Sequence, residues 1–308
     1  CSSDLEKKLQ WLELVFEQLR PLHIGKITYG VTAETEVFIP GQTMWGGLTK
    51  TFNLVNKADL SGNQELFSTI TCFFPSLDAE NILAPFYNNG LLYLGEISVD
   101  EFRFAFLDTF VSTAIKPLSR EAIDKSLHEM DFILPQPKNE WPDSGINRST
   151  KLHWIGLIGI DGDITELDAF LQEDKLTINV GGESRYGFGQ MKLHSKKIID
   201  APILEQWGLT DKGELLLKDV SSDDGKKTGL RNFVQINQDV VKAEWEGHIV
   251  PAIIPIAEFD FIRSNTPRIK EKNYYISIGS NISSIINPAA LNKFYLYKRK
   301  GKTISNCQ

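Results

Sequence analysis

A glycine-rich stretch at residues 181–189, Gly-Gly-Glu-Ser-Arg-Tyr-Gly-Phe-Gly, has the residue types of an anion-binding loop. It holds four glycines in nine positions, whereas the whole chain holds 23 in 308 residues. Glycine lets the backbone take positive φ, so successive amide groups can turn toward a phosphate. Ser184 and Arg185 can donate hydrogen bonds to phosphate oxygens, and Tyr186 and Phe188 offer faces on which bases can stack. Two interpretations fit this pattern equally well. The loop could be an RNA-binding surface, or it could be a sharp turn in which the glycines only permit close packing.

A second stretch at residues 39–48, Ile-Pro-Gly-Gln-Thr-Met-Trp-Gly-Gly-Leu, is a turn that leads into a helix. Thr43 is in position to cap a helix over residues 44–55, and Lys50 would lie one turn further along. The free amide groups and the helix dipole make such a helix start an anion site. Taken alone, however, an ordinary capped helix explains this stretch.

Two other phosphate-binding motifs do not fit the loop at residues 181–189. A dinucleotide fingerprint follows a strand and opens a helix, whereas this loop follows a helix and a short strand and runs into another strand. A P-loop ends in Gly-Lys-Ser/Thr, which this loop lacks.

The charge balance limits how the chain could bind nucleic acid. Lysine and arginine number 33, aspartate and glutamate 40, and the formal net charge is -7. This charge argues against binding over the whole surface, but it allows a basic groove on an acidic body. With 42% hydrophobic and 24% charged residues, the chain is expected to be globular and to bury a sizeable core.

Cysteine and histidine are not spaced like metal ligands, so no metal or cofactor is predicted. Cys1, Cys72 and Cys307 lie far apart, so a disulfide framework is not supported and a reducing, cytoplasmic location is favoured. No apolar run is long enough to predict a membrane span. One alternative stays open: the Cys-Ser-Ser-Asp start suits a mature lipoprotein, and the chain would then be a lipid-anchored extracytoplasmic binding protein.

Apolar periodicity predicts the elements that position these motifs. Near the start, the spacing of Leu5, Leu9, Leu12 and Phe16 favours a helix, although Leu12, Leu14 and Phe16 also alternate as in a strand. The rest reads as the two halves of a split β-α-β unit. A strand and helix at about residues 35–55 form the first half.

The second half comprises a buried strand over residues 153–160, a helix over 164–172, a strand over 177–180, the glycine-rich loop, and a strand that contains Met191 and Leu193. Between the two halves, the apolar residues show no regular spacing, and this segment is predicted to be an insertion.

Three motifs in order resemble the RAMP superfamily of CRISPR-associated proteins: Pro-Leu-His-Ile-Gly at residues 21–25, the turn and helix start at 39–48, and the loop at 181–189. Residues 109–135 and 154–158 are also similar to the middle of type III effector subunits. The resemblance covers residues 10–200 well and the remainder loosely.

The resemblance implies an α+β fold, with a ferredoxin-like, RRM-related core built on an antiparallel sheet. The core would span residues 10–200 with a large insertion at about 57–152, and residues 201–308 would be a C-terminal extension packed on it. The first element then becomes a strand at residues 11–19 instead of a helix.

The implied function is that of an RNA-binding subunit of a type III CRISPR effector complex. Its partners would be guide RNA, held by phosphate, shape and stacking contacts, and other effector subunits. The residues expected to contact RNA are His23, Gly25, Lys26, Gly41, Gln42, Thr43, Lys50, Gly181, Gly182, Ser184, Arg185, Tyr186, Gly187, Phe188, Gly189 and Lys192.

A RAMP-family endoribonuclease that processes or cleaves RNA remains the alternative, with His23 or Glu34 as the catalytic candidate. Three departures from the family pattern favour a noncatalytic subunit. Trp45 stands where the family has a phosphate-reaching lysine, and residues 26–38 lack the aspartate of cleaving members. In processing members the glycine-rich loop lies close to the C-terminus, whereas more than a third of this chain follows Gly189.

Overall fold

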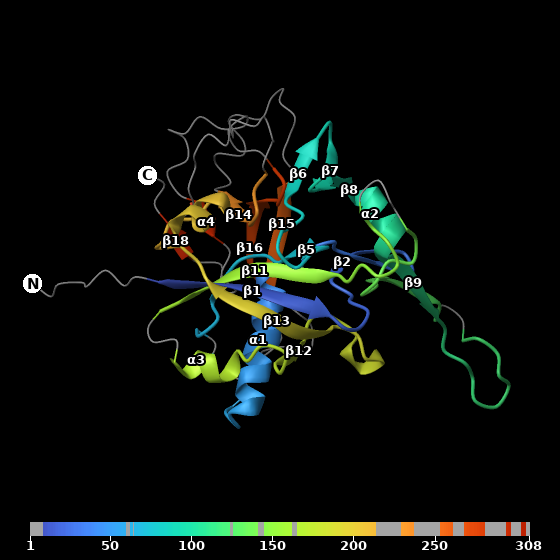
Figure 1. The fold of residues 1–308 in the computed structure, drawn as a ribbon. Coiled ribbons are helices and arrows are strands. Elements are labelled where there is room, and N and C mark those ends of the chain that lie inside the picture. The colour runs from blue at the N-terminus through green and yellow to red at the C-terminus, as the bar shows by residue number, and fades with distance from the viewer. Residues whose placement is uncertain are drawn as a thin grey trace, which may run out of the picture.

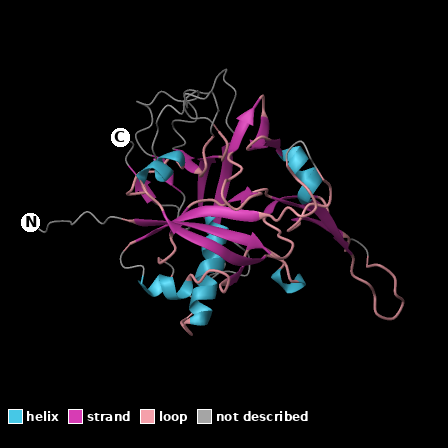
Figure 2. Ribbon diagram, in the orientation of Figure 1, coloured by secondary structure: helices cyan, strands magenta, loops and turns pink. Residues whose placement is uncertain are grey.

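The computed structural model describes residues 9–59, 62–63, 65–123, 126–140, 145–161, 165–213, 229–236, 253–260, 268–280, 294–296 and 303–305. Within these residues the chain is a mixed α+β protein with largely antiparallel sheets and few helices (Figure 1, Figure 2). None of the helices in this part of the chain is long and apolar enough to cross a membrane.

The central sheet has the strand order β12-β13-β1-β11-β4, with β5 also paired to β11, and its neighbouring strands are antiparallel. The strands are β1 (Gln10–Gln18), β4 (Thr69–Ile70), β5 (Phe74–Ser76), β11 (His153–Ile160), β12 (Thr177–Asn179) and β13 (Gln190–Ile198). Every residue of β11 is buried, which confirms the buried strand predicted from its unbroken apolar run.

The first described element is the strand β1, so the helix favoured by periodicity is wrong and the strand implied by the family resemblance is confirmed. β1 lies between β11 and β13, and Trp11, Leu12 and Leu14 are all buried, so both of its faces are covered. Because apolar residues then occur at most positions, helical spacing arises among them without a helix.

Two helices lie together against the central sheet, below it in Figure 1: α1 (Gly41–Val55) and α3 (Thr165–Phe170). The ring of Phe52 meets that of Phe170 edge-on, with centroids 5.1 Å apart. The cap predicted at Thr43 is wrong. Helix α1 begins at Gly41 with Pro40 as N-cap, and the Thr43 amide already donates to the Pro40 carbonyl oxygen at 2.9 Å.

A second sheet has the order β2-β3-β10-β9, in which β3 and β10 are parallel. Its strands are β2 (Gly25–Tyr29), β3 (Thr32–Thr35), β9 (Leu107–Ser112) and β10 (His128–Ile133). The strand predicted to start at about residue 35 is therefore displaced: β3 ends at Thr35. Further along the predicted run, Ile39 forms only an isolated bridge to Phe73. The connection between β9 and β10 projects away from the body of the molecule (Figure 1).

The segment predicted to be an insertion contributes strands to both sheets and builds a third. β4 and β5 pair with β11, and β9 and β10 pair with each other. The third sheet consists of β6 (Pro85–Asn88), β7 (Leu91–Leu94) and β8 (Ile97–Ser98). Helix α2 (Val99–Phe106) follows and begins with a capping box, because Ser98 and Glu101 each bond the other's backbone amide.

The C-terminal third adds α4 (Ala201–Gln206) and a sheet of order β15-β16-β14-β17-β18. Its strands are β14 (Val234–Ile236), β15 (Ile253–Asp260), β16 (Arg268–Ile276), β17 (Phe294–Leu296) and β18 (Thr303–Ser305). Phe233 packs on Phe38 at 5.8 Å, and the Asn232 side chain accepts a hydrogen bond from the Cys72 amide at 3.0 Å. The start of this sheet thus belongs to the same hydrophobic core as the central sheet.

Candidate nucleic-acid interface

The glycine-rich loop connects β12 to β13 and lies against the segment that follows β1. The Gly182 amide donates to the His23 carbonyl oxygen at 2.9 Å, and the Gly189 amide donates to the Pro21 carbonyl oxygen at 2.7 Å. On its other side, Leu22 exchanges backbone hydrogen bonds with Ile133 of β10. The segment at residues 21–25 is therefore held between the loop and β10.

Two of the loop glycines are required by close packing. Gly181 and Gly189 both have φ of +81°, and a Cβ atom would collide with the His23 carbonyl oxygen at Gly181 and with the Val180 carbonyl oxygen at Gly189. Gly187 also has positive φ, but no atom lies within 4 Å of a Cβ placed there. The packing explanation therefore accounts for the ends of the loop, while its middle is open to the surroundings.

The middle of the loop presents polar and aromatic side chains. Ser184, Arg185 and Tyr186 form a 3-10 turn in which all three residues are exposed. The Tyr186 ring is 58% exposed and lies 5.7 Å from the ring of Phe110 in β9. Phe188 is half-buried, with its ring 5.3 Å from that of Phe132 in β10. The loop thus contacts the second sheet through its two aromatic residues, while Ser184 and Arg185 remain exposed.

Phe110 and Phe132 were missed in the sequence. They lie on β9 and β10, in the stretch at residues 109–135 that resembles type III effector subunits, and neither is among the predicted contact residues. The strands alternate in burial only weakly, so no apolar pattern singled out these two rings. Only the paired strands bring them beneath the glycine-rich loop.

His23 is buried beside the loop. Its Nδ1 lies 2.7 Å from the carbonyl oxygen of Asp131, which can only accept a hydrogen bond, so Nδ1 carries the proton. A Cβ at Gly25 would lie 3.7 Å from the other ring nitrogen, Nε2. Glu34, the second catalytic candidate, lies on β3 with its carboxylate 3.6 Å from the ammonium group of Lys26. The structure thus shows a backbone-bonded histidine and an ion-paired glutamate.

Helix α1 brings the second motif against the first residues of the loop. A Cβ at Gly47 would lie 2.9 Å from the carbonyl oxygen of Asn179, just before the loop. A Cβ at Gly41 would lie 2.9 Å from the carbonyl oxygens of Ile70 and Thr71, so the N-terminus of the helix is packed against the β4 region. Both glycines therefore serve close packing. Of the other candidates on this helix, Gln42 and Lys50 are exposed and Thr43 is half-buried.

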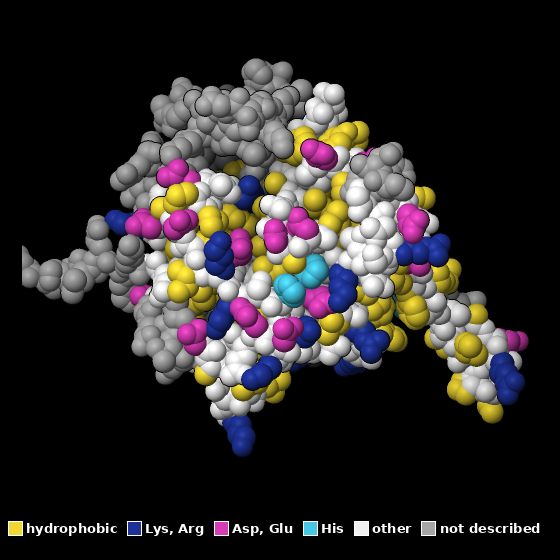
Figure 3. Space-filling view, viewed as in Figure 1, with side chains coloured by type: hydrophobic (Ala, Val, Ile, Leu, Met, Phe, Trp, Pro, Cys, Tyr) yellow, Lys and Arg dark blue, Asp and Glu magenta, His cyan; other side chains and the backbone are white. Residues whose placement is uncertain are grey.

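The four predicted cations differ in their surroundings. Lys26 pairs with Glu34, and Lys192 pairs with Asp174 at 3.1 Å and lies 3.9 Å from a carboxylate oxygen of Glu17. Lys50 and Arg185 are exposed and form no ion pair with another residue in the described part of the chain. Figure 3 shows lysine and arginine side chains interspersed with acidic ones over the visible face, without a single broad positive region.

A group of titratable side chains lies on the central sheet beside Lys192. The Glu17 carboxylate is 2.7 Å from the Lys151 ammonium group, and this hydrogen bond lowers the pKa of Glu17. The His153 and His194 rings lie 5.2 Å apart, and burial, followed by the neighbouring His194, lowers the pKa of His153. Histidine side chains gather near the centre of the face drawn in Figure 3. Among the described residues, no group of three or more His, Cys, Asp or Glu is arranged to hold a metal ion.

Comparison with known proteins gives structural matches only. No protein-family model and no curated protein matches the sequence. A chain in the cryo-EM structure of the type III-B Cmr-beta bound to cognate target RNA and AMPPnP matches with a TM-score of 0.52 and 14% identity, over 92% of this chain and 96% of that chain. A second, from Cmr-beta bound to cognate target RNA, matches with a TM-score of 0.50 and 15% identity, over 96% of this chain and 99% of that chain. The protein therefore shares the fold of chains found in type III-B Cmr-beta structures.

Proposed function

We propose that this protein is an RNA-binding subunit of a type III CRISPR effector complex. The observation that carries the proposal is the meeting of the three sequence motifs. The loop at residues 181–189 is bonded to the segment at 21–25, and Gly47 of the second motif packs at the start of the loop. The fold shared with Cmr-beta chains over nearly the full length supports the same assignment.

A ferredoxin-like core is part of this proposal. Along the chain, β1, α1, β4, β11, α3 and β13 follow in the order of two β-α-β halves. In space, the strands follow the order β13-β1-β11-β4 with antiparallel neighbours, and the rings of Phe52 and Phe170 join the two helices. Such a split arrangement supports an RRM-related core. The domain limits at residues 10–200 and 201–308 remain part of the proposal.

Guide RNA would be held at the glycine-rich loop by its backbone. Arg185 and Ser184 point outward and can donate hydrogen bonds to phosphate oxygens, while Tyr186 offers a half-exposed ring for stacking. Affinity of the isolated chain would be weak and salt-sensitive, because Lys26 and Lys192 are paired with carboxylates and the net charge is -7.

Other subunits of the complex are the proposed protein partners, and the complex would act in the cytoplasm. The connection between β9 and β10 exposes Ile115, Leu118 and Ile123, with Leu118 fully exposed. Exposed apolar residues on a projecting hairpin support contact with another macromolecule. The burial of His23, which is 8% exposed, and the ion pair between Glu34 and Lys26 support a noncatalytic role over an endoribonuclease.

The proposal is tested by purifying the chain with its neighbouring subunits and sequencing the RNA that crosslinks to it. Small guide RNA should crosslink to the wild-type chain, and Arg185→Ala should reduce the yield while the exposed control Lys175→Ala does not. A complex whose RNA never crosslinks to this chain would overturn the proposal. Cleavage of labelled RNA by wild type that is lost in His23→Ala or Glu34→Ala would establish the nuclease instead.

A further inference from the structure

A β-bulge in β13 brings two histidine side chains together on the central sheet. In the pairing of β13 with β1, the register shifts between Val15 and Phe16, so His194 has no residue opposite it. A bulge redirects side chains and interrupts the ladder of backbone hydrogen bonds. Although β1 lies between β13 and β11, the ring of His194 lies 5.2 Å from that of His153 in β11. Two groups that can each take up a proton are therefore side by side.

The two rings differ in exposure. His153 is 8% exposed, whereas His194 lies at the surface. Burial, followed by the neighbouring His194, lowers the pKa of His153. The physical cause is that a buried imidazolium ion loses hydration and lies beside a second ring that can carry the same charge. The folded state therefore favours a neutral ring at His153.

Charged groups of β1 and β13 act on the pair in opposite directions. Glu17 of β1 lies opposite His153, and its negative charge favours protonation of that ring. The same carboxylate is bonded to the ammonium group of Lys151 at 2.7 Å and lies 3.9 Å from that of Lys192. Lys192 also pairs with Asp174 at 3.1 Å. Glu17 is thus shared among several cations and offsets the cost of a charged histidine pair only in part.

On the other side of β11, the neighbour of His153 is a serine. Ser76 of β5 lies opposite His153, and its hydroxyl group donates to the Asp78 carboxylate at 3.0 Å. Against the effect of burial, hydrogen bonds led by that from Asn81 lower the pKa of Asp78 to about 2. Carboxylates ordinarily titrate near pH 4 and ammonium groups near pH 10. Within this cluster, the histidine pair is therefore the part that titrates in mildly acidic solution.

We propose that the His153–His194 pair makes the central sheet sensitive to pH, because proton uptake in mildly acidic solution loosens β13 from β1 at the bulge. The unfolded chain takes up a proton at the ordinary histidine pKa of 6.5, whereas His153 in the folded state does so only at lower pH. The stability contributed by the neutral ring is therefore present above pH 6.5 and is lost as the pH falls below it. Since the glycine-rich loop leads into β13 at Gln190, the loosened strand is the one that holds the loop.

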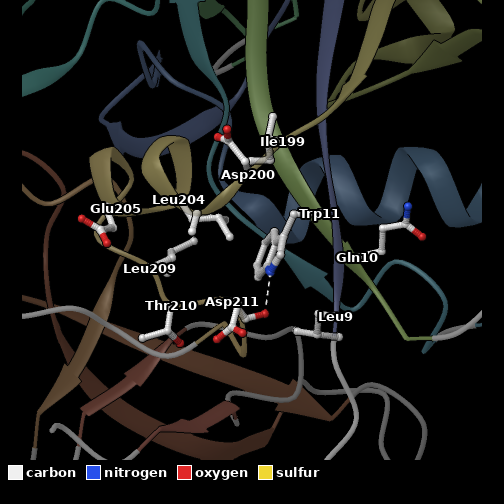
Figure 4. A pocket seen from close by; sticks show the side chains of 11 residues that line it. Leu9, Gln10, Trp11, Ile199, Asp200, Leu204, Glu205, Leu209, Thr210 and Asp211 are labelled. Carbon is white, nitrogen blue, oxygen red and sulfur yellow. Dashed lines mark hydrogen bonds between the residues drawn. The ribbon is translucent and has the colours of Figure 1, made fainter.

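The start of β1 provides an internal reference. The Nε1–H of Trp11 donates to the backbone oxygen of Asp211 at 2.9 Å, as the dashed line in Figure 4 shows. The Ile199 amide donates to the Trp11 carbonyl oxygen at 3.1 Å. An indole and backbone groups form these bonds, and neither titrates between pH 5.5 and 7.5. The Ile199 amide should therefore keep its protection from hydrogen exchange over this range.

NMR titration of the imidazole signals in the full chain tests the pair directly. His153 should titrate below pH 6.5 in the wild type and closer to pH 6.5 in His194→Gln, because the like charge is gone. His194 is exposed, so this variant should fold. The matched control is His128→Gln, which removes an exposed histidine on β10. Titration of His153 at or above pH 6.5, or an equal value in the wild type and His194→Gln, would overturn the proposal.

Unfolding by urea at pH 7.5 and 5.5 measures the consequence. One histidine that stays neutral in the folded state raises the unfolding equilibrium constant by up to about tenfold between these values. The rise should be smaller in His194→Gln than in the wild type and unchanged in His128→Gln. Hydrogen exchange, corrected for the intrinsic rate, should speed up at residues 193–195 but not at Ile199. An equal rise in the wild type and His194→Gln, or unchanged exchange at the bulge, would refute the loosening.

These measurements use the chain without RNA. Their failure therefore leaves the proposed RNA binding as it stands. Conversely, an RNA that never crosslinks to the chain would overturn the proposed function and leave the pH response intact.

Discussion

The amide nitrogen of Gly182 lies 2.9 Å from the carbonyl oxygen of His23 and donates a hydrogen bond to it. The bond joins the loop between β12 and β13 to the segment that follows β1, and a second bond, from Gly189 to Pro21, closes the other end of the loop. Backbone groups therefore hold the loop in place. Side chains in its middle, such as Arg185, are left available for a ligand.

The first prediction concerns the close approach at Gly189. Gly189→Ala should destabilise the protein by about 1–3 kcal/mol or more, because a Cβ would collide with the Val180 carbonyl oxygen and φ is +81°. Gly187→Ala is the matched control, since φ is +79° there but no atom lies within 4 Å. Urea unfolding should show the larger loss for Gly189→Ala. Equal losses would mean that φ alone, without the close contact, determines the need for glycine.

The second prediction concerns stacking by Tyr186. Tyr186→Ala should weaken guide RNA binding by about 1–3 kcal/mol in the assembled complex, whereas Tyr186→Phe should retain most of the affinity because the ring remains. Filter binding of labelled RNA measures both. Tyr186 is 58% exposed, so neither variant should lower the unfolding temperature by much. Equal loss in both variants would assign the role to the hydroxyl group instead.

The third prediction is a pH dependence at Glu17. The hydrogen bond from Lys151 lowers the pKa of Glu17 from its ordinary 4.5, so the ionised carboxylate stabilises the fold above that pH. This contribution is lost as pH falls through the lowered pKa, where the carboxylate is protonated. Glu17→Gln should therefore unfold at a lower temperature than wild type at pH 7, and the difference should shrink in acid. A difference that persists unchanged in acid would refute the ionic explanation, and Glu96→Gln, which alters an exposed carboxylate in the turn between β7 and β8, should show no such trend.

The fourth prediction concerns the joint between the two helices. Phe52→Ala should cost about 3–5 kcal/mol, because the ring is buried between Phe67 and Phe170. Leu54→Ala on the same helix is the control, since Leu54 is 59% exposed and should change stability by less than about 0.5 kcal/mol. Denaturant unfolding distinguishes the two. Similar effects would show that α1 does not pack on α3 through Phe52.

Some elements could be predicted because local pattern and tertiary environment agree. The unbroken apolar run of β11 is buried throughout, and Leu167, Phe170 and Leu171 face the core as their spacing predicts. The start of the chain could not be predicted from periodicity, because β1 is covered on both faces and carries no clean alternation. Helix α1 begins at Gly41, before the predicted start at residue 44, because Pro40 and not a side-chain cap precedes it.

The amino-acid sequence by itself supplied the residue types from which RNA contacts are proposed. The glycines, Arg185 and Tyr186 carry the necessary chemistry in their residue types, and their order along the chain carried the family resemblance. Only the tertiary structure decided which of these residues are exposed to a ligand and which are taken up by contacts within the protein. Gly181 and Gly189 serve close packing, His23 is buried, and Lys26 and Lys192 face carboxylates. Some of these contacts join residues more than a hundred positions apart, as between Gly181 and His23 and between His23 and Asp131. Others, such as Lys26 with Glu34 and Lys192 with Asp174, join residues closer along the chain. Strand pairing and loop packing determine both kinds, because they fix which backbones face one another, and no local pattern encodes that.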